Sequence, residues 1–228
     1  MKPYKAVLLI LIIILLDQAL KIWVKTHMMI CYGCPEGEFK VLGLDWFRIH
    51  FTENPGMAFG MSLPGIYGKI FLSVFRLGAV GFGIWYLRKI IRENAHWGYI
   101  TAVSMILAGA IGNMIDGTFY GVIFSDSNFK IAKLFPPEGG YAGWMQGLVV
   151  DMLWFPIYQG YIPEWVPIWG GQHFEFFKFI FNIADASITI GVFIILIFQK
   201  WFFPDKKENV SDGAHSTSAA SPPTDAAV

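Results

Sequence analysis

Four long apolar stretches constrain the fold of this chain more than any other feature of its sequence. A helix needs about 20 predominantly apolar residues to cross the hydrocarbon core of a bilayer, which is about 30 Å thick. Stretches of this kind occupy residues of about 5–24, 66–87, 97–115 and 177–199. Hydrophobic residues also make up 55% of the chain, an unusually high share for a soluble domain. We therefore predict an all-α membrane protein built on a four-transmembrane-helix bundle.

Basic residues gather at one end of the predicted helices. They precede the first stretch, join the second to the third, and follow the fourth: Lys2, Lys5, Arg88, Lys89, Arg92, Lys200, Lys206 and Lys207. By the positive-inside rule we expect both termini to be cytoplasmic, with long extracytoplasmic loops at 25–65 and 116–176. The basic start and apolar core also fit a secretory signal, but no small-x-small cleavage site follows, so we expect an uncleaved first helix.

The segments outside the helices carry weaker signals. Residues 46–51 alternate between apolar and polar side chains, which predicts a half-buried strand in a small extracytoplasmic β-sheet. The apolar run at 147–157 is too short to span, and we expect a re-entrant or interfacial element there. Residues 1–203 are expected to form a single membrane domain. Residues 204–228 lack apolar periodicity, which predicts a disordered cytoplasmic tail.

The two cysteines and the net charge exclude some classes of function. Cys31 and Cys34 lie on the predicted outer side, where a disulfide is the favoured state. A zinc site would need further ligands at matching spacing, and none is visible, so we expect no metal. The formal net charge of zero argues against a nucleic-acid partner, since binding a phosphate backbone requires clustered Lys and Arg.

Ionisable and amide side chains occur within the predicted spans, where a charge costs about 2.5–3.5 kcal/mol on insertion scales. Asp17 and Lys21 are four residues apart and can pair on one helix face. Taken alone, they are best interpreted as a structural ion pair. Asn113 and Asp116 share one face of the third predicted helix. The predicted topology puts all of these groups toward the outer side.

Two further acids, Asp151 and Asp185, are placed where they could act together. Two carboxylates held close cannot both ionise at neutral pH, so such a pair can supply a general acid and a general base around one water. The residues alone favour structural hydrogen bonding or a proton relay over such a pair. The main alternative is a small proton-coupled carrier in which Asp17, Asp116 and Asp185 form a relay. A carrier predicts internal repeats and acids spread through the bilayer depth, and the sequence has neither pattern.

Five motifs follow one another in a distinctive order. They are DQALK at 17–21, ENPGMAFG at 53–60, GNMID at 112–116, VVDM at 149–152 and FNIAD at 181–185. In this order the chain resembles the lipoprotein signal peptidases, also called signal peptidase II, over residues 5–200. The resemblance implies an aspartic endopeptidase of the bacterial inner membrane. Such an enzyme removes the signal peptide of a prolipoprotein by cutting just before a cysteine that carries diacylglycerol, and it uses no cofactor.

The resemblance also implies a set of site residues and ligands. It implies that Asp151 and Asp185 form the catalytic pair, acting on a water near the extracytoplasmic face. Other motif positions are implied to support the pair or contact the substrate: Asp17, Lys21, Asn54, Gly56, Asn113, Asp116 and Asn182. The implied ligands are the diacylglyceryl prolipoprotein, membrane lipid and the inhibitor globomycin.

Two features depart from the family pattern. The GNxxD motif of the family is normally followed by Arg, but here Gly117 follows Asp116. We hypothesise that Arg76, inside the second predicted helix, reaches the Asp116 region and replaces the missing guanidinium; alternatively it pairs elsewhere or snorkels to an interface. The segments 117–150 and 152–176 are longer than in compact relatives, and we expect them to form a structural cover over the active site.

Overall fold

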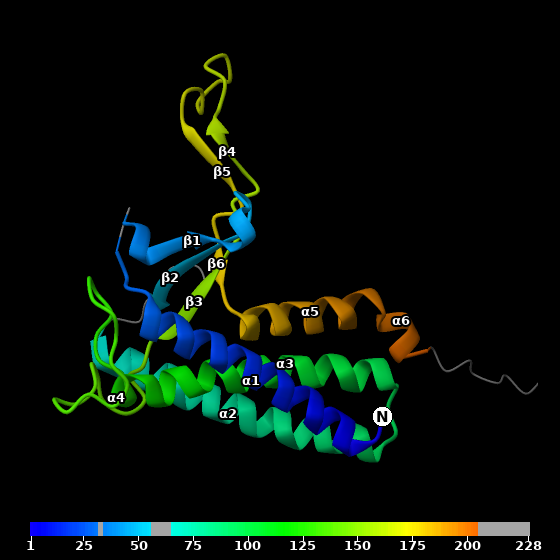
Figure 1. Ribbon diagram of the computed structural model, residues 1–228. Coiled ribbons are helices and arrows are strands. Elements are labelled where there is room, and N and C mark those ends of the chain that lie inside the picture. Colours follow the sequence, from blue (N-terminus) through cyan, green and yellow to red (C-terminus); the bar gives the residue numbers. More distant parts are fainter. Residues whose placement is uncertain (32–33, 56–64, 205–228) are drawn as a thin grey trace, which may run out of the picture.

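Long apolar helices form the body of the protein. The computed structural model describes residues 1–31, 34–55 and 65–204. Helices α1 (Pro3–His27), α2 (Gly65–Arg92) and α3 (Trp97–Ile115) run alongside one another, and α3 contacts both of the others (Figure 1). Beyond α3 the chain continues through the π-helix η4 (Asp116–Tyr120) and the short α4 (Gly121–Ile123). Within the described residues, three helical segments are long and apolar enough to cross a membrane: Pro3–His27, Ile66–Arg92 and Trp97–Ile123.

The fourth apolar helix, α5 (Ile183–Ile197), is shorter than the sequence predicts and begins later than residue 177. The residues just before it, Ile180–Phe181, form strand β6 and pair with another strand instead of extending the helix. Asn182 then caps the helix, because its side chain accepts a hydrogen bond from the amide of Asp185. A short helix, α6 (Gln199–Phe202), follows at the end of the bundle where α1 begins (Figure 1).

Close packing of α5 on α3 depends on glycine. A Cβ atom added to Gly109 of α3 would lie 2.2 Å from the carbonyl oxygen of Ala184. A Cβ atom added to Gly191 of α5 would lie 2.7 Å from the carbonyl oxygen of Ala102. Only a residue without a side chain fits at either point, so the two backbones approach closely, as small residues allow in membrane helices. This contact holds the first turn of α5 beside the C-terminal half of α3.

A four-stranded antiparallel sheet lies at one end of the bundle, which confirms that a small β-sheet accompanies the helices. Its strands are β1 (Glu38–Lys40), β2 (Arg48–Asn54), β3 (Val149–Trp154) and β6, in the order β1-β2-β3-β6. The predicted alternation is confirmed in β2, where Ile49 and Phe51 are buried and Arg48 and His50 are only partly so. These buried residues pack with Val24 and other apolar side chains at the end of α1.

Strand β3 corrects the prediction of a re-entrant or interfacial element at 147–157. Val149, Val150, Asp151 and Met152 are all buried, so both faces of this strand are covered and its sequence reads as a continuous apolar run. Such a run cannot be assigned to a strand or a helix by periodicity. Its antiparallel pairing with β2 identifies the segment as a strand, with Thr52 opposite Asp151 and Asn54 opposite Val149.

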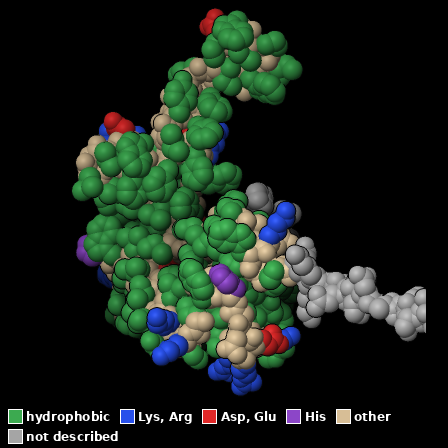
Figure 2. Space-filling view, turned by 90° about the vertical axis from the view of Figure 1, so that its right-hand side faces the viewer, with side chains coloured by type: hydrophobic (Ala, Val, Ile, Leu, Met, Phe, Trp, Pro, Cys, Tyr) green, Lys and Arg blue, Asp and Glu red, His purple; other side chains and the backbone are tan. Residues whose placement is uncertain are grey.

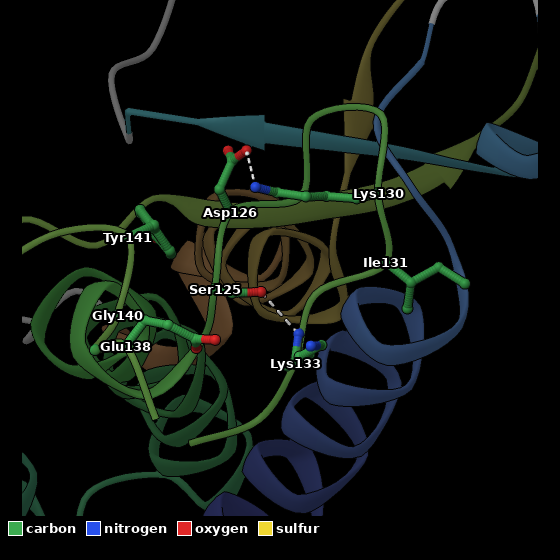
Figure 3. A pocket seen from close by; sticks show the side chains of 9 residues that line it. Ser125, Asp126, Lys130, Ile131, Lys133, Glu138, Gly140 and Tyr141 are labelled. Atoms are coloured by element: carbon green, nitrogen blue, oxygen red, sulfur yellow. Dashed lines mark hydrogen bonds and ion pairs between the residues drawn. The ribbon is translucent and has the colours of Figure 1, made fainter. Parts of the chain in front are cut away.

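The loop that joins α4 to β3 is bound to the end of α1. The amide of Ala132 donates to the carbonyl oxygen of Lys25, and the Lys25 ammonium pairs with Glu53 and donates to Ser127 Oγ at 3.0 Å. Nearby, Cys31 and Cys34 form a disulfide, as favoured from the sequence. The loop also lines a surface pocket of about 420 Å³ (Figure 3), beside which the Asp126 carboxylate pairs with the Lys130 ammonium. None of the site acids predicted from the sequence lines this pocket.

The remaining long insertion forms a two-stranded hairpin, β4 (Tyr158–Tyr161) and β5 (His173–Phe176). The hairpin projects away from the helices and the four-stranded sheet (Figure 1). The expected cover over the active site is therefore wrong for this part of the chain. Gly56 and most of the predicted tail at 204–228 lie outside the described residues.

Candidate active site

Four carboxylates converge where the helices meet the sheet. Each comes from a different element: Asp17 from α1, Asp116 from η4, Asp151 from β3 and Asp185 from the first turn of α5. Asp17, Asp116 and Asp151 are buried, with exposed fractions of 1%, 0% and 3%. Asp185 is partly exposed. The structure thus brings together acids that are up to 168 positions apart, the separation of residues 17 and 185 (185 − 17).

Lys21 is a buried cation that lies between two of these acids and pairs with both. Its Nζ atom lies 2.8 Å from Asp17 Oδ2 and 2.7 Å from Asp116 Oδ2, and it donates to Asn113 Oδ1 at 3.0 Å. The predicted pair on α1 is therefore present, but it is one half of an ion triad that also holds η4. Buried charges of this kind need full pairing, since removing one partner leaves an uncompensated charge.

Gln18 is a member of this cluster that the sequence analysis missed. Its Nε2 atom donates to Asp17 Oδ2 at 3.1 Å and to Asp116 Oδ1 at 2.9 Å, while its Oε1 atom accepts from the hydroxyl of Tyr120 at 3.0 Å. Gln18 lies three residues before Lys21 on α1, a spacing that places the two side chains on neighbouring positions of one helical face. Its spacing from Lys21 and its position within the DQALK motif were both available signals.

The ion triad reaches the backbone beside each of the two predicted catalytic acids. Asp17 Oδ1 accepts from the amide of Ala184 at 2.9 Å, and Ala184 directly precedes Asp185. Asp116 Oδ2 accepts from the amide of Val150 at 3.3 Å, and Val150 directly precedes Asp151. The two flanking carboxylates therefore fix the chain on which the other two acids are carried.

Three asparagines hold the carboxylates of Asp151 and Asp185. Asn182 Nδ2 donates to Asp151 Oδ1 at 2.7 Å, while Asn182 Oδ1 accepts from the amide of Asp185 at 2.8 Å. Asn113 Nδ2 donates to Asp185 Oδ1 at 2.7 Å, and Asn54 Nδ2 donates to Asp151 Oδ2 at 3.3 Å. Asn182 and Asn113 are also joined to each other at 3.2 Å. One amide network consequently orients both acids.

Burial makes Asp151 a weaker acid than an ordinary aspartate. Loss of hydration, reinforced by the nearby charge of Asp185, raises the pKa of Asp151 to about 7. Hydrogen bonds from Asn54 and Asn182 act in the opposite direction, because they favour the ionised carboxylate. A carboxyl group with this pKa can hold or release a proton near neutrality, which is what general acid–base chemistry requires.

Arg76 of α2 lies beside Gly117, the position at which this chain departs from the family pattern. A Cβ atom added to Gly117 would lie 3.0 Å from Nη1 of Arg76. The negative charges that act on this guanidinium are, in decreasing order, those of Asp116, Asp185 and Asp151. A side chain at residue 117 would therefore compete for space with a cation that faces the acids.

Comparison with known proteins identifies the family. A model of the family described as signal peptidase (SPase) II matches residues 9–202. This chain belongs to the signal peptidase II family. The lipoprotein signal peptidase of Porphyromonas gingivalis is 48% identical over 190 residues, which cover 83% of this chain and 80% of that protein. That of Amoebophilus asiaticus is 34% identical over 201 residues, covering 86% and 78%.

The fold of this signal peptidase II family member also matches solved structures. A structure described as a bacterial membrane enzyme at 2.3 Å resolution aligns with a TM-score of 0.56 and 24% identity. The match covers 92% of this chain and 96% of that one. Family membership confirms the resemblance inferred from the five motifs and makes the chain a membrane peptidase. The described site residues predicted from those motifs lie within one connected network.

Proposed function

We propose that this chain is an intramembrane aspartic endopeptidase that removes signal peptides from bacterial prolipoproteins. It hydrolyses the peptide bond before the diacylglyceryl-modified cysteine, with Asp151 and Asp185 as the catalytic pair. The observation that carries the proposal is the bridge through Asn182, which donates to the carboxylate of Asp151 and accepts from the amide of Asp185. Two acids from a strand and a helix are thereby aligned by one side chain.

The chemistry uses a single proton shared by the pair. The ionised carboxylate takes a proton from a water, whose oxygen then attacks the scissile carbonyl carbon. The protonated partner donates to the carbonyl oxygen, and the tetrahedral intermediate collapses when the C–N bond breaks and a proton passes to the leaving amine. The raised pKa of Asp151 favours this one-proton state up to about neutral pH.

The other polar residues of the network position and orient the catalytic pair. Asp17, Lys21 and Asp116 position the backbone that carries the two acids, as the bonds to Ala184 and Val150 suggest. Asn54, Asn113 and Asn182 orient the carboxylates and keep their free lone pairs directed at the substrate. Substrate contact at Gly56 remains a prediction from the motif.

Arg76 supplies the guanidinium that the family pattern places after GNMID. Its support is the 3.0 Å approach of Nη1 to the Cβ position of Gly117, together with the attraction from Asp116. A guanidinium carried by α2 can fill the space that an arginine at residue 117 would occupy. In this arrangement a side chain at residue 117 would crowd the Arg76 guanidinium, which would have to shift by a few tenths of an ångström to make room.

Charge at the opposite end of the bundle supports the orientation. The end view in Figure 2 shows Lys and Arg side chains around that end, and Arg88, Lys89 and Arg92 line a surface hollow there. By the positive-inside rule this end is cytoplasmic, so both termini are cytoplasmic and the acids and sheet are extracytoplasmic. In this topology α5, followed by α6, is the fourth crossing of the inner membrane.

The proposal is tested by cleavage of a diacylglyceryl prolipoprotein by the purified full-length protein in detergent. Because positioned acid–base groups contribute about 10²–10⁴-fold to rates, Asp151→Asn and Asp185→Asn should each lower turnover at least that much. Asp126→Asn, at an acid outside the network, is the matched control and should cleave like the wild type. Globomycin should inhibit the wild type. Cleavage by both catalytic-site variants at the wild-type rate would refute the mechanism.

A further inference from the structure

The β4–β5 hairpin is an amphipathic element that the peptidase mechanism does not use. In the register of its strands, Tyr158 lies opposite Phe176 and Gly160 opposite Phe174. Because opposite residues and residues two apart share a face, one face carries the exposed aromatic rings of Tyr158, Phe174 and Phe176. The other face carries Gln159, Tyr161, His173 and Glu175. The hairpin therefore has one apolar and one more polar side.

The turn between these strands is also apolar and exposed. Ile168 is 85% exposed and Trp165 is 81% exposed, and Trp169 is exposed as well. Exposed apolar side chains that are grouped together in this way usually mark a protein or membrane contact. In Figure 2 the hairpin stands clear of the body of the molecule and hydrophobic side chains cover most of its visible surface.

The hairpin is directed along the plane in which a membrane surface would lie. In Figure 1 it runs across the direction of the helices, and it leaves the body on the side where α5 begins. At its base Phe177 contacts both Phe179 and Phe181, with ring centroids 6.0 Å apart in each case. This aromatic stripe leads into α5, whose exposed side chains include Ile190 and Phe193. The hairpin is thus joined through a short aromatic segment to a helix that exposes apolar side chains.

We propose that the β4–β5 hairpin lies in the headgroup layer of the outer leaflet of the bilayer that the helices cross. The face that carries Tyr158, Phe174 and Phe176 is directed at the acyl chains, and Gln159 on the opposite face is directed at water. Trp and Tyr prefer this layer, since a ring with an apolar body and a polar edge matches both of its sides. Two-faced elements lie flat in it for the same reason. The choice of leaflet rests on the topology proposed above.

An interfacial hairpin would also set the depth of the active site. Residues 177–182 alone connect β5 to α5, and Asp185 lies in the first turn of that helix. Anchoring β5 at the headgroup layer therefore restricts how far Asp185 can move along the membrane normal. A substrate whose lipid is held in the same leaflet would meet the acids at a fixed depth.

The test measures the depth of single spin labels on the full-length protein in vesicles of phosphatidylethanolamine and phosphatidylglycerol. The native cysteines are paired in a disulfide, so one introduced cysteine is labelled in each variant. Tyr158→Cys and Gln159→Cys are adjacent residues on opposite faces and form the matched pair, while Ile168→Cys reports on the turn. Collision rates with oxygen, which partitions into lipid, and with a water-soluble nickel chelate give the depth. Thermal unfolding verifies that each variant is folded.

We expect the oxygen-to-nickel collision ratio to be several-fold higher at residues 158 and 168 than at residue 159. Equal, water-like ratios at all three positions would overturn the proposal, because the hairpin would then extend into water. Low collision with both reagents at 158 and 168 would overturn it in favour of a protein partner or a second copy. The same measurement in an Asp185→Asn background needs no cleavage, so its outcome is separate from that of the proposed peptidase activity.

Discussion

Asp151 should make the folded protein less stable as the pH rises. An unfolded aspartate has a pKa of about 3.9, whereas burial and the charge of Asp185 raise the pKa of folded Asp151 to about 7. Between these values the folded state holds a proton that the unfolded state has released. The stabilisation from this proton is complete below about pH 4 and is lost as the pH rises to about 7, at about 1.4 kcal/mol per pH unit, or about 4 kcal/mol altogether.

Asp151→Asn should remove this dependence, because the amide keeps the size of the side chain and cannot ionise. Its Oδ1 atom can still accept from Asn182, as the carboxylate does. Most of the loss of stability in the wild type occurs above pH 5. The free energy of unfolding of the variant, relative to that of the wild type, should therefore rise by about 3 kcal/mol between pH 5 and pH 8. For a chain of this size that corresponds to roughly 5–10 °C in the midpoint of thermal unfolding.

Thermal unfolding of the detergent-solubilised protein at pH 5 and pH 8 measures this difference directly. Asp126→Asn is the control, because Asp126 is outside the buried network and pairs with Lys130. In an Asp185→Asn background the gain should be smaller, since the charge that helps to raise the pKa of Asp151 is gone. A difference between Asp151→Asn and wild type that stays constant from pH 5 to pH 8 would refute the reasoning.

Three further predictions concern the network and its surroundings. Lys25→Met should lower the free energy of unfolding by about 3–5 kcal/mol, because it leaves Glu53 buried without its cation. Adding Glu53→Gln should restore most of that loss in thermal unfolding, and a double variant as unstable as the single one would exclude a charge effect. Arg76→Met should reduce cleavage, and Gly117→Arg added to it should recover activity, since the new guanidinium occupies the vacated space; equal activity of Arg76→Met and wild type would contradict this role. Cleavage per enzyme should fall above about pH 7, where Asp151 loses its proton, and an unchanged kcat/KM up to pH 9 would count against a shared proton.

Features that depend on local spacing were predictable from the sequence. The long apolar stretches correspond to helices α1, α2 and α3, and the part of the 46–51 alternation from Arg48 onward lies in strand β2, with Ile49 and Phe51 buried. The spacing of Asp17 and Lys21 predicted their ion pair. The order of five short motifs was enough to identify the family, because each motif lies within a few consecutive residues.

Features that depend on long-range pairing were not predictable in the same way. Strand β3 has an apolar sequence that fits a buried strand or a buried helix, and only its partner β2 distinguishes them. The start of α5 was placed too early because Ile180–Phe181 pair with β3, which removes them from an otherwise continuous apolar run. The contact of Gln18 with Asp116 was not predictable in this way, because the two residues lie 98 positions apart.

The sequence by itself determined the membrane character of the protein, the order of its helices and the identity of its acids, since each is recorded in the chemistry of neighbouring residues. The tertiary structure alone decided which of those acids face one another. It joined Asp151 and Asp185 through Asn182, attached Lys21 to two carboxylates, and brought Arg76 beside Gly117. These contacts are set by how a helix bundle packs against a sheet, and packing depends on the whole chain because burial and charge pairing are satisfied only in three dimensions.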